Sequence, residues 1–461
     1  MPRPHAQPLA LSLRRGTGLA LPVQLAAQIR DLLRRGALAP GSRLPSSRTL
    51  AAELGVARAV VEQGYDQLQA EGWTQALRGA GTFVTDVDVR RPPVAPLGSP
   101  VRAPRDDRSR LIPLDTGTPW QDPRGDAGWR RAWREVALQR MPTGYPDAAG
   151  LRELREELAG YVGRRRGIAC TADHVLVTAG TTHAWSLVLD NLPAGPVAVE
   201  DPGYRAAAAV ATDADRKLVD VPVDSEGIDV GSLTEAPADL RAVYVTPAHQ
   251  HPLGVTMSVR RRMALLAEAT RRRVLVVEDD YDSEFRYDMA PLPALAALDL
   301  DRVVYLGTSS KIVQPGIRLG WLVASTAVVA GIAARRARRH DHPSWPLQAA
   351  LLSMLREGHL DRLVRSARRV YAERSRLVVE RLGACGHHVD DVAGMYVAVP
   401  LSARQETAVV AAAGEAGFAL PPLSAFCRTV ARHGVVLGFG AVDDRQLQRV
   451  LDVVEGALKQ P

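Results

Sequence analysis

The stretch "VLVVEDDYDSEF", residues 274–285, begins as an uninterrupted apolar run and ends among acidic side chains. A strand that is apolar at successive positions is covered on both faces, which is typical of the parallel sheets of α/β folds. The chain contains four further runs of this kind, namely "VLVTAG" (175–180), "VAVEDP" (197–202), "AVYVTP" (242–247) and "VVYLGT" (303–308). Helical patterns alternate with these runs, so the sequence predicts an α/β fold with an open, mainly parallel sheet.

Each of the five runs ends in small or polar residues. In open parallel sheets, ligands bind at the carboxyl ends of the strands. The pattern therefore predicts one shared site, formed by Thr178–Thr182, Asp201–Tyr204, Thr246–His251, Glu278–Tyr281 and Thr308–Lys311.

Lysine is rare in this chain and stands at one of these strand ends. Among the 58 basic residues, only Lys217, Lys311 and Lys459 are lysine. Lys217 and Lys459 lie in polar surroundings typical of the surface, whereas Lys311 follows an apolar run. A neutral lysine amine attacks a carbonyl to form a Schiff base, most usefully with pyridoxal 5'-phosphate, and arginine does not. Lys311 is therefore predicted to bind that cofactor, with a purely structural lysine as the alternative.

The other strand ends supply what pyridoxal phosphate needs. A helix that begins within "TAGTTHAW" (178–185) offers backbone N–H groups to the phosphate, and Arg318 offers a fixed cation. Asp279 is suited to keeping the pyridine nitrogen protonated, so that the ring can act as an electron sink. Tyr281 is placed to reach the phenolic oxygen of the ring, and Tyr204 to stack on it. Each residue alone is a weak signal, but their order along successive strand ends is a strong one.

The composition predicts a globular protein of at least two domains. The chain has 461 residues, of which 46% are hydrophobic and 24% charged. Cys170, Cys385 and Cys427 are far apart and lack metal-ligand spacing, so we expect no metal site and free thiols in a reducing cytoplasm. We see neither a signal peptide nor an apolar run of the roughly 20 residues that a membrane span needs. A cytoplasmic location without a membrane partner is expected.

The positive charge is concentrated near the N-terminus. Residues 1–85 hold 10 arginines against 5 acidic residues, and residues 86–112 hold 6 against 4. Since the whole chain has 58 basic and 51 acidic residues, the remaining 349 residues hold 42 of each. This distribution favours a polyanion partner for the N-terminal part, with a merely solvated basic face as the alternative. Residues 86–112 are rich in Pro and Arg, which is typical of a semi-extended linker.

The first domain has the pattern of a winged helix-turn-helix. Three helical segments are predicted within residues 22–36, 46–55 and 56–72, the second capped by Ser46 or Ser47 and ended by Gly55. Residues 73–85 then read as two short strands around a turn that contains glycine.

Two known families share these motifs. "PGSRLPSSRTLAAELGV" (40–56), "GYDQLQAEG" (64–72) and "GAGTFV" (79–84) resemble the GntR-type winged helix. "VEDPGY" (199–204), "YVTPAHQHPLGVTMS" (244–258), "YLGTSSK" (305–311) and "RLGW" (318–321) resemble the fold-type I aminotransferase domain of MocR/GabR-type transcriptional regulators. The resemblance implies a DNA-binding domain at 12–85, a linker at 86–112 and a domain that binds pyridoxal phosphate at 113–461.

The resemblance also implies roles for individual residues. In the C-terminal domain, Lys311 would carry the cofactor and Asp279 would pair with the pyridine nitrogen, with the neighbouring Asp280 as the alternative. Tyr281 would meet the phenolic oxygen and Tyr204 would stack on the ring. The phosphate would be surrounded by Thr181, Thr182, Thr308, Ser310 and Arg318. Tyr145 would reach across from a second subunit, which implies a homodimer. The carboxylate of an amino-acid effector would meet Arg432, with Arg428 as the alternative.

In the N-terminal domain, the positions that match DNA contacts are Arg48, Arg58, Arg78 and Gly79. Arginine bonds guanine bidentately or clasps phosphate, although any one of these arginines is otherwise an ordinary solvated residue.

Two departures from the family pattern matter. Ala57 stands where a capping Ser or Thr is usual at the start of the third helix, and Ala59 and Val60 follow it. This predicts an uncapped helix with few groups for reading base edges. His251 stands where an aromatic residue is usual, and it is either an effector contact or a tolerated neighbour of the cofactor.

The function expected from these observations is transcriptional regulation. The protein would bind double-stranded DNA as a dimer and use pyridoxal phosphate, or an amino compound that reacts with it, to change that binding. The alternative is an active aminotransferase with a secondary DNA-binding domain, in which Lys311 also serves as the general base.

Overall fold

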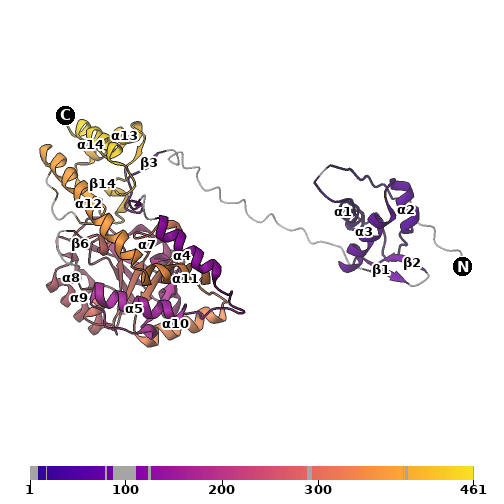
Figure 1. Ribbon diagram of the computed structural model, residues 1–461, viewed down its shortest axis with the longest axis horizontal. Coiled ribbons are helices and arrows are strands. Elements are labelled where there is room, and N and C mark those ends of the chain that lie inside the picture. Colours follow the sequence, from indigo (N-terminus) through magenta and orange to yellow (C-terminus); the bar gives the residue numbers. More distant parts are fainter. Residues whose placement is uncertain are drawn as a thin grey trace. The chain divides into compact units, whose positions relative to one another are not determined.

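The computed structural model describes residues 9–16, 18–77, 80–86, 111–122, 126–287, 293–387, 389 and 393–459. The chain divides into two compact units, Met1–Arg105 and Asp106–Pro461, each of which is considered by itself (Figure 1). Within the described ranges, none of the helices has the length and apolar character needed to cross a membrane.

The N-terminal unit is a winged helix. Its elements are α1 (Leu21–Arg34), α2 (Ser47–Leu54), α3 (Arg58–Ala70), β1 (Thr74–Leu77) and β2 (Gly81–Val84), the two strands pairing antiparallel. Leu25, Ile29, Leu50, Val61 and Leu68 are buried between the three helices. The unit thus has a hydrophobic core of its own.

Local sequence sets the ends of α2 and α3. The Ser46 side chain accepts a hydrogen bond from the Thr49 backbone N–H at 3.1 Å, and Gly55 ends α2 with a φ of 64°. This confirms the predicted bounds. Ala57 precedes α3 and gives it no side-chain cap, as its methyl group dictates. Gly64 lets α3 pack closely on α1, since a Cβ there would lie 2.9 Å from the Leu25 side chain and displace it.

The C-terminal unit is built on an eight-stranded sheet. Its strands, in spatial order, are β4 (Val175–Thr178), β11 (Gly320–Val323), β10 (Val303–Thr308), β9 (Leu275–Asp280), β8 (Ala242–Val245), β5 (Val197–Asp201), β6 (Leu218–Asp224) and β7 (Gly227–Ile228). Pairing is parallel from β10 through β9, β8 and β5 to β6, while β11 is antiparallel to both β4 and β10. The five predicted strands therefore run in one direction and end at one edge.

Helices cover both faces of this sheet. They are α4 (Asp126–Leu138), α5 (Arg152–Arg166), α6 (Thr181–Asn191), α7 (Arg205–Asp213), α8 (Val230–Leu233), α9 (Val259–Arg272), α10 (Thr326–Arg338), α11 (Trp345–Arg356) and α12 (His359–Ala384). Successive residues of β4 enter different core clusters: Val175 and Val177 pack with Leu158 of α5, whereas Leu176 packs with Trp185 of α6. Burial on both sides explains why these strands are apolar throughout.

A smaller layer completes the unit at its C-terminal end (Figure 1). Its elements are β12 (Tyr396–Pro400), α13 (Ala403–Glu415), β13 (Phe418–Ala419), β14 (Gly434–Gly438) and α14 (Asp444–Leu458). β12 and β14 pair antiparallel, and β13 pairs in parallel with β3 (Ile112–Pro113). The chain thus enters the C-terminal unit through β3 and passes next to the carboxyl edge of the large sheet.

Candidate functional site

A cavity of about 150 Å³ lies at the carboxyl edge of the large sheet. Residues from all five predicted strand ends line it, including Thr181 after β4, Tyr204 after β5, His251 after β8, Asp279 in β9 and Lys311 after β10. The structure therefore brings together residues that are more than a hundred positions apart in the chain. The cause is the common direction of the five strands.

One end of the cavity is suited to an anion. α6 begins at Thr181, with Gly180 at its N-cap in a conformation (φ 100°) that a side chain would strain. The Arg318 guanidinium lies against this turn, 3.6 Å from where a Cβ of Gly180 would stand. Thr182, Thr308 and Ser310 line the same cavity. The helix N-terminus, the hydroxyls and the guanidinium are the kinds of group that bind a phosphate.

Asp279 lines the same cavity from β9 and is buried. The Tyr244 hydroxyl donates a hydrogen bond to Oδ2 of Asp279, while Oδ1 is buried and has no hydrogen-bond partner among the described residues. Burial raises the pKa of Asp279 to about 7, opposed by hydrogen bonds from Tyr244 and Thr181. A carboxylate with one free, buried oxygen is suited to a protonated ring nitrogen, which would both satisfy that oxygen and lower the pKa again.

The adjacent Asp280 has a different place. Its Oδ2 lies 2.6 Å from Nε of the buried Arg166 and accepts a hydrogen bond from the Tyr305 hydroxyl at 2.7 Å. Because side chains alternate along a strand, Asp280 points to the opposite face of β9. Either carboxylate could hold the ring nitrogen as far as the sequence shows, but Asp279 lines the cavity and Asp280 pairs with Arg166.

Lys311 is almost enclosed, and its amine is held by the entering chain. Nζ donates a hydrogen bond to the backbone oxygen of Gly117 at 2.5 Å. Burial lowers the pKa of Lys311, although the carboxylates of Asp115, Asp282 and Asp279 oppose the shift. A lowered pKa increases the fraction of neutral amine, which is the nucleophilic form.

His251 is buried among aromatic rings beside Lys311. Its Nε2 lies 2.8 Å from Oγ1 of Thr116, and the rings of Tyr204 and Phe426 pack edge-to-face on it with centroids 5.4 and 5.3 Å away. Burial, aided by His249 and Lys311, lowers the pKa of His251 to about 3. The imidazole is therefore neutral at physiological pH and can act only as a polar, uncharged contact.

Replacing His251 with phenylalanine is expected to make the C-terminal unit less sensitive to acid. Below pH 6.5 the unfolded chain protonates this histidine, whereas the folded chain excludes the proton down to about pH 3, so the free energy of unfolding falls as pH decreases. Between pH 7 and pH 5, His251 alone lowers the free energy of unfolding by about 2 kcal/mol. Urea unfolding followed by tryptophan fluorescence at both pH values measures the difference. If the free energy of unfolding fell equally in wild type and variant between pH 7 and pH 5, His251 would not be neutral in the folded protein.

Tyr281 belongs to a buried network next to the cavity. Its hydroxyl donates to the backbone oxygen of His249 at 2.9 Å and lies 2.7 Å from the Tyr396 hydroxyl. His249 Nδ1 in turn lies 2.7 Å from Oδ2 of Asp282. The phenol is therefore fixed in position at the cavity wall, and its pKa is raised by burial and by the Asp282 carboxylate.

Three predicted residues do not line this cavity. Tyr145 is 78% exposed and stacks on His342, with ring centroids 5.2 Å apart. The Arg432 guanidinium donates to the backbone oxygen of Val223 at 2.6 Å, and Nε of Arg428 lies 2.6 Å from Oδ1 of Asp220. The roles assigned to these residues stay predictions.

Thr116, Gly117 and Tyr244 were not predicted from the sequence. Thr116 and Gly117 line the cavity but precede the first of the five predicted strands. Tyr244 lies inside an apolar strand, where its hydroxyl gives no signal in the sequence. Only the tertiary structure shows these contacts.

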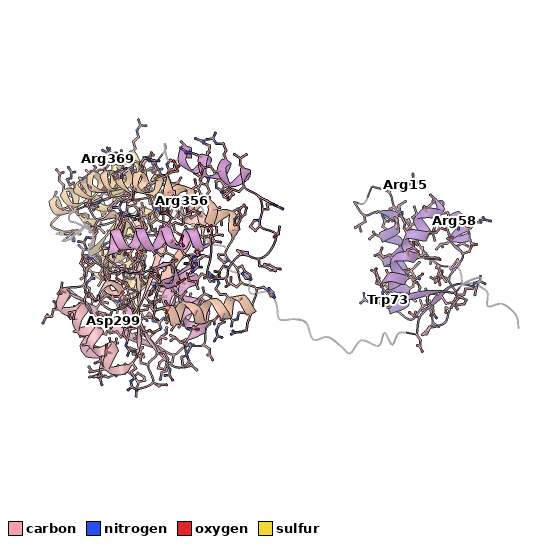
Figure 2. All side chains as sticks on the ribbon, turned by 60° about the horizontal axis from the view of Figure 1, so that its bottom comes forward. Arg15, Arg58, Trp73, Asp299, Arg356 and Arg369 are labelled. Atoms are coloured by element: carbon pink, nitrogen blue, oxygen red, sulfur yellow. The ribbon has the colours of Figure 1, made fainter. Side chains whose placement is uncertain are left out.

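In the N-terminal unit, Arg48 on α2 and Arg58 at the start of α3 are both exposed. Figure 2 shows Arg58 at the surface of this unit. Its Nε donates to Oε1 of Glu62 at 2.7 Å and to Oγ of Ser47 at 3.2 Å, so it is held between α2 and α3. Arg78 and Gly79 lie outside the described residues.

The residues present fit pyridoxal phosphate. Gly180, Lys311 and Asp279, whose Oδ1 has no partner among the described residues, line one cavity, and the Arg318 guanidinium lies beside Gly180. Fold and site together define a class of protein: a winged-helix DNA-binding domain joined to a fold-type I aminotransferase domain.

Comparison with known proteins identifies the same two domains. Residues 111–452 match the family described as aminotransferase class I and II, and residues 21–84 match the gntR family of bacterial regulatory proteins. The chain is 36% identical over 459 residues to the HTH-type pyridoxine biosynthesis transcriptional regulator PdxR of Corynebacterium glutamicum, covering 98% of each chain. It is 31% identical to the probable rhizopine catabolism regulatory protein MocR of Rhizobium meliloti, covering 97% of this chain and 95% of that protein.

Among solved structures, the kynurenine aminotransferase of Pyrococcus horikoshii superimposes with a TM-score of 0.68 at 27% identity, covering 76% of this chain and 91% of that one. This chain therefore belongs to the MocR-type family of transcriptional regulators, in which a GntR-type DNA-binding domain is fused to an aminotransferase-like domain.

Proposed function

We propose that this regulator holds pyridoxal 5'-phosphate on Lys311 and that occupancy of the site changes its affinity for DNA. The cofactor would supply an aldehyde for the lysine amine and a ring that withdraws electrons. Asp279 would hold the ring nitrogen, Tyr204 and Tyr281 would flank the ring, and Thr181, Thr182, Thr308, Ser310 and Arg318 would bind the phosphate.

The single observation that carries the sensing role is the contact of Lys311 with Gly117. Gly117 belongs to the segment 114–118, which we call the entry segment because it follows β3 and the predicted linker 86–112. The amine of Lys311 donates to its backbone at 2.5 Å, and His251 contacts its Thr116. Two side chains of the ligand cavity therefore hold the part of the C-terminal unit through which the chain arrives from the DNA-binding domain.

A ligand that engages the Lys311 amine competes with Gly117 for it. The entry segment would then keep its internal hydrogen bonds, which the backbone N–H groups of Gly117 and Thr118 donate to Oδ1 of Asp115. It would lose the hydrogen bond from Lys311 to Gly117. Such a ligand interacts differently with the two states of the segment, which is the requirement for shifting an equilibrium between them.

The nature of the signal is suggested by the relatives. The Corynebacterium glutamicum regulator is named for pyridoxine biosynthesis and matches this chain along nearly its whole length. Pyridoxal phosphate itself is therefore the first effector to test. An amino compound that reacts with it is the second, and neutral His251 and the more distant Arg432 are the side chains proposed to meet it.

A homodimer is part of this proposal. Tyr145 extends from a segment that also exposes Leu138 (87%) and Met141 (77%). Exposed apolar residues of this size favour a protein partner, and a second copy would place Tyr145 at the neighbouring cavity.

Replacing Arg58 with alanine is expected to weaken DNA binding by about 5- to 150-fold, since a good arginine contact contributes about 1–3 kcal/mol. DNase footprinting and gel shift on the intergenic DNA upstream of the gene, with and without pyridoxal phosphate, measure it. Arg34→Ala, which removes an exposed arginine from the end of α1, is the matched control. If wild-type protein gives no footprint under either condition, the proposed function is wrong.

Aminotransferase activity is a second candidate, because the lowered pKa of Lys311 also suits a base that moves a proton between ligand atoms. Sustained conversion of an amino acid and a keto acid, lost in Lys311→Ala, would support it. Absence of turnover across common amino donors would leave regulation as the function of the site.

A further inference from the structure

The first turns of α12 carry exposed arginines that the proposed ligand site does not use. Arg362, Arg365 and Arg369 are exposed and follow one another at intervals of three and four residues. Residues at this spacing share one face of a helix. Figure 2 shows Arg369 at the surface of the C-terminal unit. We call these three residues the α12 arginines.

These arginines have no acidic partner within the described ranges. Other exposed arginines are paired, such as Arg152 with Glu156 at 3.1 Å and Arg271 with Glu268 at 2.6 Å. Near the cluster in sequence, Asp361 binds Arg165 at 2.5 Å and Glu357 binds Arg131 at 3.1 Å. The exposed Glu373, four residues after Arg369, forms no ion pair with it in the described part of the chain. The α12 arginines are therefore free to bind an external anion.

The α12 arginines line a groove of about 450 Å³ between α12 and α4. Gly128 of α4 lets the start of α12 lie close to α4, since a Cβ there would lie 2.4 Å from Nδ1 of His359. His359 begins α12 and accepts a hydrogen bond from Arg362 at 2.7 Å. The positive end of the helix dipole adds to the charge near Arg362, in the first turn, while Asp122 is the acidic residue of the lining.

The arrangement is that of a linear array rather than a single pocket. Arg362 and Arg369 are seven residues apart, which is about 10 Å along a helix axis. One strand of DNA presents a phosphate about every 3.4 Å of its axis, so this length matches about three phosphates. Residues 113–461 have no net charge, so the cluster is a local concentration and not a consequence of a basic domain.

We infer that the α12 arginines bind the phosphate backbone of DNA next to the sequence that the N-terminal unit binds. A linker of 27 residues (86–112) can span at most roughly 90 Å, which allows both units to reach one duplex. This inference rests on DNA binding by the chain and adds to it a contact from the aminotransferase-like unit. Binding by this surface is electrostatic and independent of base sequence.

The test compares Arg365→Gln/Arg369→Gln with wild type in the full-length protein. Each protein is titrated at several salt concentrations with a duplex of about 60 base pairs from the upstream intergenic DNA, and with its footprinted core of about 20 base pairs. Each lost phosphate contact reduces the slope of log K against log salt by about 0.9. We expect the slope of the double variant to be smaller by about 2 for each subunit that contacts the long duplex, and unchanged on the short one.

The matched control is Arg445→Gln/Arg449→Gln, which removes two exposed arginines at the same spacing from α14. It is expected to behave as wild type on both duplexes. Equal slopes for the α12 variant and wild type on the long duplex would overturn the inference while leaving the proposed function in place. Absence of wild-type binding to either duplex would overturn both.

Discussion

Replacing Lys311 with alanine is expected to abolish covalent attachment of pyridoxal phosphate and, with it, any effect of the cofactor on DNA binding. Lys311 is the lysine that lines the cavity, and its amine is the group that attacks an aldehyde. After incubation with the cofactor and reduction with borohydride, mass spectrometry should find the adduct on Lys311 of the wild type and none in the variant. The visible absorbance of the bound cofactor should disappear in parallel.

Two controls make this result specific. Lys217→Ala removes a lysine that does not line the cavity and should retain adduct and absorbance. Lys311→Arg keeps a positive charge at the position but lacks a nucleophilic amine at physiological pH, so it should behave as the alanine variant. An adduct of wild-type yield in Lys311→Ala would show that the cofactor reacts elsewhere and would remove the basis of the proposed function.

Replacing Asp279 with asparagine is expected to weaken cofactor binding by roughly 100-fold, since removing one partner of a buried charge pair costs about 3 kcal/mol or more. Asp279 is buried with Oδ1 unpartnered among the described residues, so a protonated ring nitrogen is the group that would satisfy it. The dissociation constant is obtained by titrating the apo-protein with pyridoxal phosphate and following visible absorbance.

The neighbouring residue provides the comparison. Asp280→Asn removes the partner of Arg166 on the other face of β9, so it should lower the free energy of unfolding by about 3 kcal/mol while changing cofactor affinity much less. If Asp280→Asn weakened cofactor binding as much as Asp279→Asn, the assignment of the two faces would be wrong.

The strand ends show why so much could be predicted from sequence. A strand covered on both faces must be apolar throughout, so its polar end stands out, and parallel strands bring such ends to one edge. Asp279, Tyr204, Thr181 and Lys311 were nominated in this way and line one cavity. The antiparallel β11 was not expected, because its pairing with β4 and β10 depends on long-range contacts that leave no periodic signal.

The two-part organisation and the residue types at the strand ends could be predicted without knowledge of the fold, because capping residues, strand ends and a rare lysine are local signals and motifs carry the family resemblance. The structure was needed to show that Asp279 and not Asp280 lines the cavity, that Lys311 contacts Gly117, and that burial lowers the pKa of His251. These properties depend on burial and on contacts between distant segments, which a linear sequence does not contain.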